Sequence, residues 1–214
     1  MKLQSFQRIK DQLIKGKYVF LSEFKISLFT NTNILILGIF VGNHAVGYFT
    51  SAEKLARAIG NFQTPISNTL FPFLSKEMAL NKIRTFTKIN KITKIGAICF
   101  SSIVIFGFLF SEEIIALVYG QGMSPSIILF KILIIIPLAS FLDSMFGKQI
   151  LLNLGKDNLY FRVILWATIL NVSINLGLTY FYKELGTAIA LAVTQVFIVL
   201  GMWFYAKREM DKVY

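Results

Sequence analysis

The sequence is short of the residues on which much protein chemistry depends. Its 214 residues include one cysteine, Cys99, and one histidine, His44. A disulfide within the chain is therefore excluded, and zinc, haem or a Cys/His catalytic dyad would find almost no ligands or nucleophiles. Charge is also scarce, since 15% of the residues are charged, against about 25% in a typical soluble domain. We expect no metal and no other cofactor.

Apolar residues are abundant instead. They make up 55% of the chain, Phe alone contributes 21 residues, and the mean hydropathy is +0.65. A soluble fold could not bury this surface, so the composition predicts an all-α integral membrane protein. Stretches of about 20 residues suit a hydrocarbon core about 30 Å thick. Five are clear, at residues 18–41, 92–118, 125–152, 159–181 and 186–205.

A sixth stretch, residues 48–75, is ambiguous because Glu53, Lys54 and Arg57 stand among its apolar residues. Short cytoplasmic loops retain Lys and Arg, so the charge distribution can decide whether this stretch crosses the membrane. If it crosses, 17 Lys and Arg fall on the amino-terminal side and only Lys183 on the other; if not, the division is at best 12 against 6. We therefore predict six transmembrane helices in a bundle at residues 18–207, with both termini cytoplasmic.

Two segments outside these stretches are basic and amphipathic. In residues 1–17, Leu3, Phe6, Ile9 and Leu13 recur every three or four positions among Lys and Arg. This pattern predicts an interfacial helix on the anionic headgroups of membrane lipids, with a frayed basic tail as the alternative. Residues 76–94 repeat the pattern, and residues 208–214 form a cytoplasmic tail. The excess of 22 Lys and Arg over 11 Asp and Glu thus indicates cytoplasmic loops, not a nucleic-acid partner.

The ambiguous stretch has two faces if it is helical. Spacings of three and four place its polar residues in one stripe, which could line a cavity. This stripe consists of Glu53, Arg57, Asn61, Thr64 and Asn68. An apolar stripe opposite would meet lipid or other helices, and it consists of Leu55, Ile59, Phe62, Ile66, Leu70 and Phe73. Pro65 lacks a backbone donor, so we expect a kink or break near it.

The charges inside the predicted spans are candidate binding residues, because each costs about 2.5–3.5 kcal/mol at a helix centre. Arg57 is the first candidate, since its guanidinium suits phosphate oxygens. Alternatively, Glu53 neutralises Arg57 four residues away and Lys54 snorkels outward. The remaining candidates for a substrate-binding cavity are Lys54, Lys25, Lys131, Glu53 and Asn61. Lys25 could equally snorkel to the interface, and Pro137 could bend the span that holds Lys131.

Other polar residues within the spans suggest different roles. Asp143 either pairs with Lys148 or serves a coupling cation. Five further side chains suit interhelical hydrogen bonds better than ligand contacts, namely Asn171, Ser173, Asn175, Thr194 and Gln195. Bases outnumber acids within the spans, so a cavity should favour an anion such as a phosphate or pyrophosphate group. Catalytic carboxylate pairs and a phosphate-binding loop are absent from the sequence, so we predict no enzyme activity.

Three motifs carry a resemblance to a known family. The segment VGYFTSAEKLARAIGNFQTPISNTLFPFLSK, Val46–Lys76, resembles the eighth-helix region of O-antigen and related polysaccharide flippases. These flippases belong to the multidrug/oligosaccharidyl-lipid/polysaccharide exporter superfamily. LNLGKDNLYFRV at Leu152–Val163 and LGTAIALAVTQ at Leu185–Gln195 resemble later helices of the same family, though less specifically. The resemblance covers essentially the whole chain.

The resemblance implies one lobe, the carboxy-terminal six helices, of a twelve-helix alternating-access exporter. The implied activity is flipping of undecaprenyl-pyrophosphate-linked O-antigen or a related oligosaccharide across the bacterial inner membrane, for surface polysaccharide and lipopolysaccharide biosynthesis. Arg57, Lys54, Lys25 and Lys131 would attract the pyrophosphate or acidic sugars. Many relatives carry an acid near Gln195, so the amide here weakens proton coupling at that site.

The resemblance also implies partners for the chain. The substrate would be the lipid-linked oligosaccharide, within membrane lipids. Because Met1 falls where the middle of the family would be, we expect a truncated or split product, with the amino-terminal six-helix lobe supplied by a separate chain.

Three other functions are compatible with such a sequence. A cation-coupled multidrug exporter of the same superfamily would depend on Glu53 or Asp143, not on the bases. A non-transporting membrane scaffold for polysaccharide assembly would suit a half-length chain equally well. A lipid-modifying membrane enzyme would need clustered acids or histidines near one interface, and the sequence lacks them.

Overall fold

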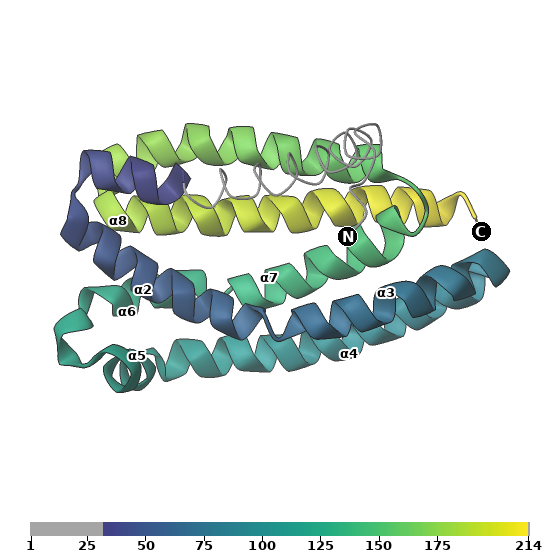
Figure 1. Cartoon of the computed structure of the whole chain (residues 1–214), viewed down its shortest axis with the longest axis horizontal. Helices are drawn as coiled ribbons and strands as arrows, with labels where there is room; N and C mark the ends of the chain where they lie inside the picture. The colour runs from purple at the N-terminus through teal and green to yellow at the C-terminus, as the bar shows by residue number, and fades with distance from the viewer. Residues whose placement is uncertain (1–31, 214) are drawn as a thin grey trace, which may run out of the picture.

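The computed structural model describes residues 32–213, and the regular elements among them are all helical (Figure 1). The prediction of an all-α protein is therefore confirmed. Predictions for residues 1–31, which include the amphipathic segment, most of the first span and Lys25, lie outside the described residues. After the helical residues 32–40, the elements are α2 (Asn43–Gly60), α3 (Gln63–Leu80), α4 (Lys82–Leu109), α5 (Ser111–Tyr119), η1 (Gln121–Met123), α6 (Pro125–Leu133), α7 (Ile136–Asp143), η2 (Ser144–Leu152) and α8 (Asp157–Asp211).

Three helical stretches of the described chain are long and apolar enough to cross a membrane. They are Lys82–Leu109, Pro125–Leu152 and Asp157–Asp211. The last folds back on itself at Lys183, where φ is 52° and ψ is −134°. Its two arms correspond to the predicted spans 159–181 and 186–205. Since α2 and α3 are not among these stretches, the total of six spans stays a prediction.

The long axis of the molecule separates two sets of connections (Figure 1). One end holds the α3–α4 turn, the loop from η2 to α8 and the carboxy-terminal end of α8. The other end holds α5 and the fold-back of α8. Helices α2 and α3 follow one another from the second end to the first, so together they run the length of the molecule.

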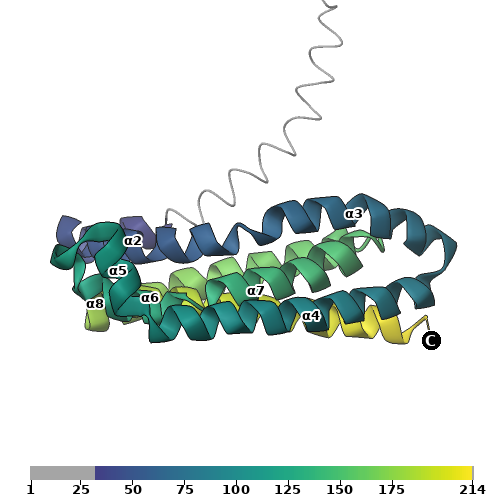
Figure 2. The same cartoon turned by 90° about the horizontal axis from the view of Figure 1, so that it is seen from below.

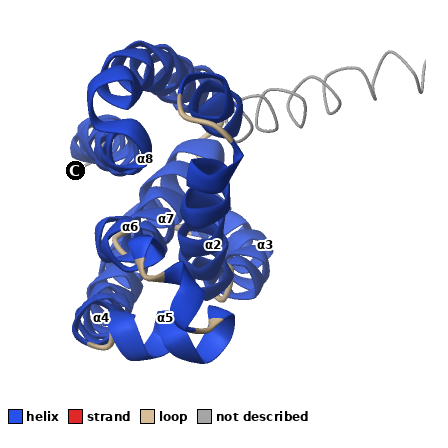
Figure 3. Ribbon diagram, turned by 90° about the vertical axis from the view of Figure 1, so that its left-hand side faces the viewer, coloured by secondary structure: helices blue, strands red, loops and turns tan. Residues whose placement is uncertain are grey.

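The segment formed by α6, α7 and η2 lies at the centre of the helices. It packs against α2, α4 and α8, as the view along the long axis shows (Figure 3). Its buried residues include Phe130, Leu133, Ile136 and Phe141. A nearly continuous apolar sequence suits this position, because a central helix meets other helices on several sides.

Two helices are interrupted just before a proline. In the first, Phe62 N donates to Ile59 O at 3.3 Å and Thr64 N donates to Asn61 O at 3.0 Å, so tight turns replace the α-helical bonds. The predicted break therefore falls one turn before Pro65, which lies in the first turn of α3. A proline is tolerated there because the first amides of a helix have no intrahelical acceptor. The second interruption, at residues 134–135, precedes Pro137 in the same way.

The fold-back of α8 depends on a close approach between its arms. A Cβ atom on Gly186 would lie 2.0 Å from Leu178 O, so only glycine fits there. Next to these two residues, Thr179 and Thr187 share a hydrogen bond of 2.8 Å between their hydroxyls. The last two predicted spans, residues 159–181 and 186–205, are thus joined as a tight helical hairpin.

The stretch predicted to span at residues 92–118 is divided between two helices. Helix α4 begins at Lys82, and the side chain of the capping residue Asn81 accepts a hydrogen bond from Arg84 N at 3.0 Å. It ends at Leu109, and α5 starts after Phe110 with Glu112 and Glu113 in its first turn. Acidic residues favour a helix start because they face the positive end of the helix dipole. The basic segment 76–94 is therefore the end of α3 and the first half of α4.

Many large apolar side chains face outward. In α4, Ile98 is 69% exposed and Leu109 is 67% exposed. Inside, two main clusters hold the helices together, one around Phe49, Leu129 and Phe130 and the other around Phe86, Ile150 and Met202. An apolar exterior over a packed apolar interior is what a lipid-facing helical protein requires.

Candidate functional site

Arg57 and Glu53 form an ion pair near the end of α2. Arg57 Nε donates to Glu53 Oε1 at 2.8 Å. The Glu53 side chain is 5% exposed, whereas that of Arg57 is 36% exposed. The pairing anticipated from the four-residue spacing is thus present. The Nη groups of Arg57 make no hydrogen bond within residues 32–213, so the guanidinium keeps donors for an anion.

The rest of the predicted polar stripe lies on the surface. Asn61, Thr64 and Asn68 are exposed, and so is Lys54. The stripe follows α2 and α3, which lie along one side of the molecule (Figure 2). The face turned toward the other helices carries small residues instead, including Ala52, Ala56 and Gly60. Small side chains let helix backbones approach closely, which explains why neither predicted stripe is the packed face.

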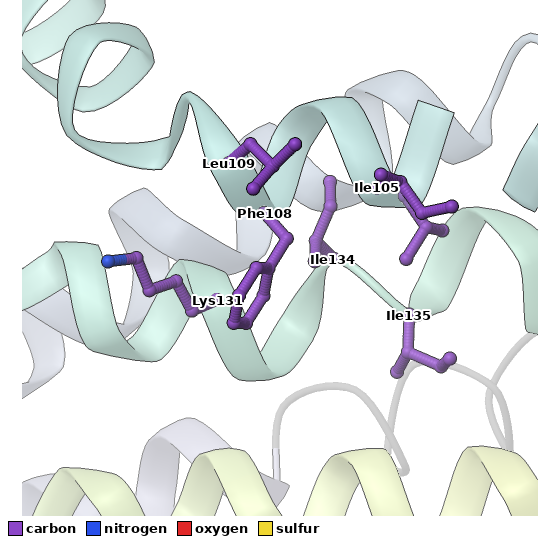
Figure 4. Close-up of a pocket in the computed structure, with 7 residues that line it drawn as sticks. Ile105, Phe108, Leu109, Lys131, Ile134 and Ile135 are labelled. Carbon is purple, nitrogen blue, oxygen red and sulfur yellow. The ribbon is translucent and has the colours of Figure 1, made fainter. Parts of the chain in front are cut away.

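Lys131 forms an ion pair with a different acid from that of Arg57. Its Nζ donates to Glu112 Oε1 of α5 at 3.3 Å. Its aliphatic stem lines a hollow of about 320 Å³ between α4 and the α6–α7 segment, beside Phe108 and Ile134 (Figure 4). The ammonium points away from this hollow. The lining of the hollow is almost wholly apolar. The aliphatic carbons of Lys131 therefore line it, whereas its charged ammonium lies beside Glu112.

Asp143 is the last residue of α7, where the α-helix passes into the wider π-helix η2. It is half-buried, and no ion pair joins it to Lys148 in the described part of the chain. A Cβ on Gly147 would lie 3.3 Å from Asp143 Oδ1 and 2.8 Å from Tyr160 Cε2. The missing side chain at Gly147 therefore leaves room for both the carboxylate and the Tyr160 ring.

The buried link between α3 and η2 was not predicted. The Ser67 and Ser144 hydroxyls share a hydrogen bond of 2.6 Å, and Gln149 Nε2 donates to Ser67 O at 2.9 Å. All three residues are buried. The signal in the sequence was the seven-residue spacing of Gly60, Ser67 and Leu74, which marks one helix face.

Polar residues of α8 join its two arms and the first described helix. Asn171 Nδ2 donates to Thr194 Oγ1 at 3.1 Å, and Asn175 Nδ2 donates to Asn33 Oδ1 at 2.7 Å. The interhelical role predicted for these residues is confirmed. Ser173 differs, because it is exposed and bonds only Ile169 O of its own helix.

Metal ligands do not gather anywhere in residues 32–213, where no group of three or more His, Cys, Asp and Glu could hold an ion. What the described chain offers is a half-exposed cation on a broken helix, a half-buried carboxylate in the central segment, and helices apolar enough to cross a bilayer. The molecule is a multi-pass helical membrane protein.

Comparison with known proteins identifies its family. Residues 2–128 match the model of a family described as "Polysaccharide biosynthesis protein". The match covers more than half of the chain, so the protein belongs to this family of polysaccharide biosynthesis proteins. No solved structure matches it.

Several named relatives are similar along most of the chain. It is 26% identical over 209 residues to the "Putative O-antigen transporter" of Escherichia coli (strain K12), covering 96% of this chain and 49% of the relative. The protein of the same name from Shigella dysenteriae is 27% identical, with 91% and 49% covered. The "Probable low-salt glycan biosynthesis flippase" of Haloferax volcanii is 26% identical, with 91% and 41% covered. The chain therefore spans about half the length of these relatives.

Proposed function

We propose that this chain is the carboxy-terminal six-helix lobe of a flippase for undecaprenyl-pyrophosphate-linked O-antigen or a related oligosaccharide. One observation carries the proposal: nearly the whole chain aligns with about half of a protein named as an O-antigen transporter. These relatives are named as transporters and a flippase, not as enzymes. The membrane would be the bacterial inner membrane.

The positions of the connections support six spans with both termini in the cytoplasm. The α3–α4 turn, the η2–α8 loop and the carboxy-terminal end lie at one end of the molecule (Figure 1). Most of the Lys and Arg residues among residues 32–213 lie in these connections or in the helix ends that flank them. Basic loops stay in the cytoplasm, so this end would face inward. Helices α2 and α3 together would form the second span.

Arg57 is the proposed contact for the pyrophosphate. Its guanidinium is half-exposed and only its Nε is engaged by Glu53, so further N–H groups can donate to phosphate oxygens. Lys54 is exposed on the same helix and would add to the positive field. Asn61 continues the polar surface. Lys131 is a weaker candidate, because its ammonium is directed at Glu112.

The other half of the proposed transporter would be an amino-terminal lobe. The exposed polar side of α2 and α3 is the surface on which we propose that this lobe lies. A cavity between two lobes would then place Arg57 where a lipid-linked anion passes.

A chimaera tests this function. In cells lacking their own O-antigen flippase, the aligned half of the Escherichia coli relative would be replaced by this chain. We expect the chimaera to restore surface polysaccharide, measured on gels of extracted glycolipid, whereas the chain alone does not. Full restoration by the membrane-inserted chain alone would refute the lobe assignment. If Arg57→Ala and Lys131→Ala together leave the chimaera at normal levels, the cationic site is wrong.

Asp143 favours a second candidate function, a cation-coupled multidrug exporter. A half-buried carboxylate without an ion pair in the described chain is suited to bind a coupling cation. This candidate predicts that Asp143→Asn abolishes drug efflux driven by a cation gradient in the chimaera, while Arg57→Ala does not. The flippase proposal predicts the greater loss from Arg57→Ala, in polysaccharide export.

A further inference from the structure

Helix α4 has a strongly basic first half and no acid. Its 28 residues contain no Asp or Glu, whereas Lys and Arg recur through the first thirteen positions. One of these cations, Lys88, is paired with Glu77 of α3. Lys91 and Lys94 are exposed and form no ion pair within residues 32–213. The charge of these two lysines is therefore available to an external anion.

Both lysines line a shallow groove of about 520 Å³, together with Thr87, Asn90 and Ile95. The two lysines are three residues apart and so lie on the same face of the helix. Two ammonium groups with the Asn90 amide beside them suit the oxygens of a phosphodiester, whereas the Thr87 hydroxyl donates to Ile83 O at 3.1 Å within its own helix. Ile95 adds an exposed apolar side chain to the lining.

The same helix face continues as an apolar strip. Beyond Lys94 it passes through Ile98, Ser102, Ile105 and Leu109, at spacings of three and four. The three aliphatic residues are 69%, 60% and 67% exposed in that order. The Ser102 hydroxyl donates to Ile98 O at 3.0 Å, so its donor is satisfied within the helix. Ile105 and Leu109 then reach the apolar hollow of about 320 Å³ shown in Figure 4.

The length of this face matches one leaflet. Lys94 and Ile105 are eleven residues apart, which is about 16 Å along a helix with a rise of about 1.5 Å per residue. Half of a hydrocarbon core about 30 Å thick is about 15 Å. With the lysines at headgroup level, the hollow beside Ile105 would lie near the bilayer midplane.

We propose that this face of α4, from Thr87 to Leu109, binds one anionic phospholipid. The phosphate lies between Lys91 and Lys94, and an acyl chain follows Ile98 to the hollow beside Ile105. Charge complementarity selects an anionic headgroup, and the exposed aliphatic strip selects a ligand with a chain of leaflet length. The proposal does not depend on the proposed transport function, because the face is separate from Arg57 on α2.

Lipid titration of the full chain tests the proposal. Purified protein in a neutral detergent would be titrated with phosphatidylglycerol or phosphatidylcholine and bound lipid counted by native mass spectrometry. The variant is Lys91→Gln with Lys94→Gln. The matched control is Lys82→Gln with Arg84→Gln, which removes the same charge from exposed positions of the same helix outside the groove.

We expect the groove variant to lose about tenfold in apparent affinity for phosphatidylglycerol, since each basic residue near an anionic lipid contributes appreciably. The control should lose less than about twofold, because distant exposed charges are screened. Phosphatidylcholine binding should not change in either variant. Lys91→Arg with Lys94→Arg should retain the affinity for phosphatidylglycerol. That result would attribute the loss in the Gln variant to the removed charge.

Several results would overturn the proposal. Equal losses in the groove variant and the control would mean a general attraction to the basic end of the molecule. Binding of glycerophosphoglycerol, which has no acyl chains, as tightly as the whole lipid would remove the role of the aliphatic strip. Displacement of phosphatidylglycerol by an equimolar polyprenyl diphosphate would assign the face to the transported class of lipid instead.

Discussion

Gly60 lies against the backbone of Pro137, where the break between α2 and α3 meets the break between α6 and α7. A Cβ on Gly60 would be 3.5 Å from Pro137 Cα, which is an ordinary contact. Alanine therefore fits, and we expect Gly60→Ala to change stability by less than about 1 kcal/mol, with helix propensity in its favour.

A larger residue at this crossing has no room. We expect Gly60→Leu to destabilise the protein by about 1–3 kcal/mol, because the branched side chain would push against a backbone that cannot move aside. Thermal unfolding of both variants in detergent measures the difference. Equal melting temperatures for the two variants would show that the breaks do not pack as described.

The hairpin of α8 predicts a contrast between two of its glycines. A Cβ on Gly186 would lie 2.0 Å from Leu178 O, whereas a Cβ on Gly177 meets nothing within 4 Å. We expect Gly186→Ala to cost more than about 2 kcal/mol, since backbone atoms must shift. Gly177→Ala should be neutral or slightly stabilising. Chemical denaturation of the two single variants checks this order, and a reversed order would contradict the hairpin geometry.

The hydrogen bond between Asn171 and Thr194 predicts a measurable coupling. In a double-mutant cycle with Asn171→Ala and Thr194→Val, we expect an interaction free energy of about 0.6–2 kcal/mol. Ser173→Ala is the matched control, because its hydroxyl bonds only its own helix. Unfolding in mixed micelles provides the free energies. A coupling indistinguishable from zero would mean that Asn171 and Thr194 do not hold the arms together.

The pair of Glu53 and Arg57 has two separable roles, neutralisation and anion binding. Arg57→Ala leaves a buried carboxylate without its partner, so we expect both lower stability and lower polysaccharide export in the chimaera. The double exchange Glu53→Arg with Arg57→Glu restores a pair on the same helix. If the pair only neutralises charge, the exchange should recover export as well as stability.

If Arg57 also holds the substrate, the exchange should recover stability alone. We expect this second result, with export at least about tenfold below that of the parent, because a charge-assisted hydrogen bond is worth about 1.5–3 kcal/mol. Lys82→Ala serves as the control, since it removes an exposed cation outside the proposed site. Export equal to the parent after the exchange would exclude Arg57 as a substrate contact.

Local sequence patterns predicted several features accurately. The salt bridge of Arg57 follows from its spacing from Glu53, and both helix breaks follow from Pro65 and Pro137. These effects act within a few residues, so the neighbouring sequence is sufficient to predict them. The first break lies one turn before Pro65, because a proline is accommodated within a first helical turn.

Packing partners could not be predicted in the same way. The hydrogen bond between Ser67 and Ser144 joins residues 77 positions apart. The spacing of Gly60, Ser67 and Leu74 marks a helix face but does not reveal which helix it contacts. Lys131 shows the same limit, since its partner Glu112 lies on another helix.

The sequence by itself determined that this protein is helical, that it belongs in a membrane, and which of its loops are basic. Composition and short-range periodicity are enough for these properties, because each helix satisfies its backbone internally and lipid selects its apolar surface. Only the tertiary structure decided which charges of the predicted spans have donors left for another partner. Arg57 is half-exposed above a buried Glu53, while the Lys131 ammonium is drawn to Glu112. Such differences depend on contacts between distant helices, and those contacts exist only after the helices pack.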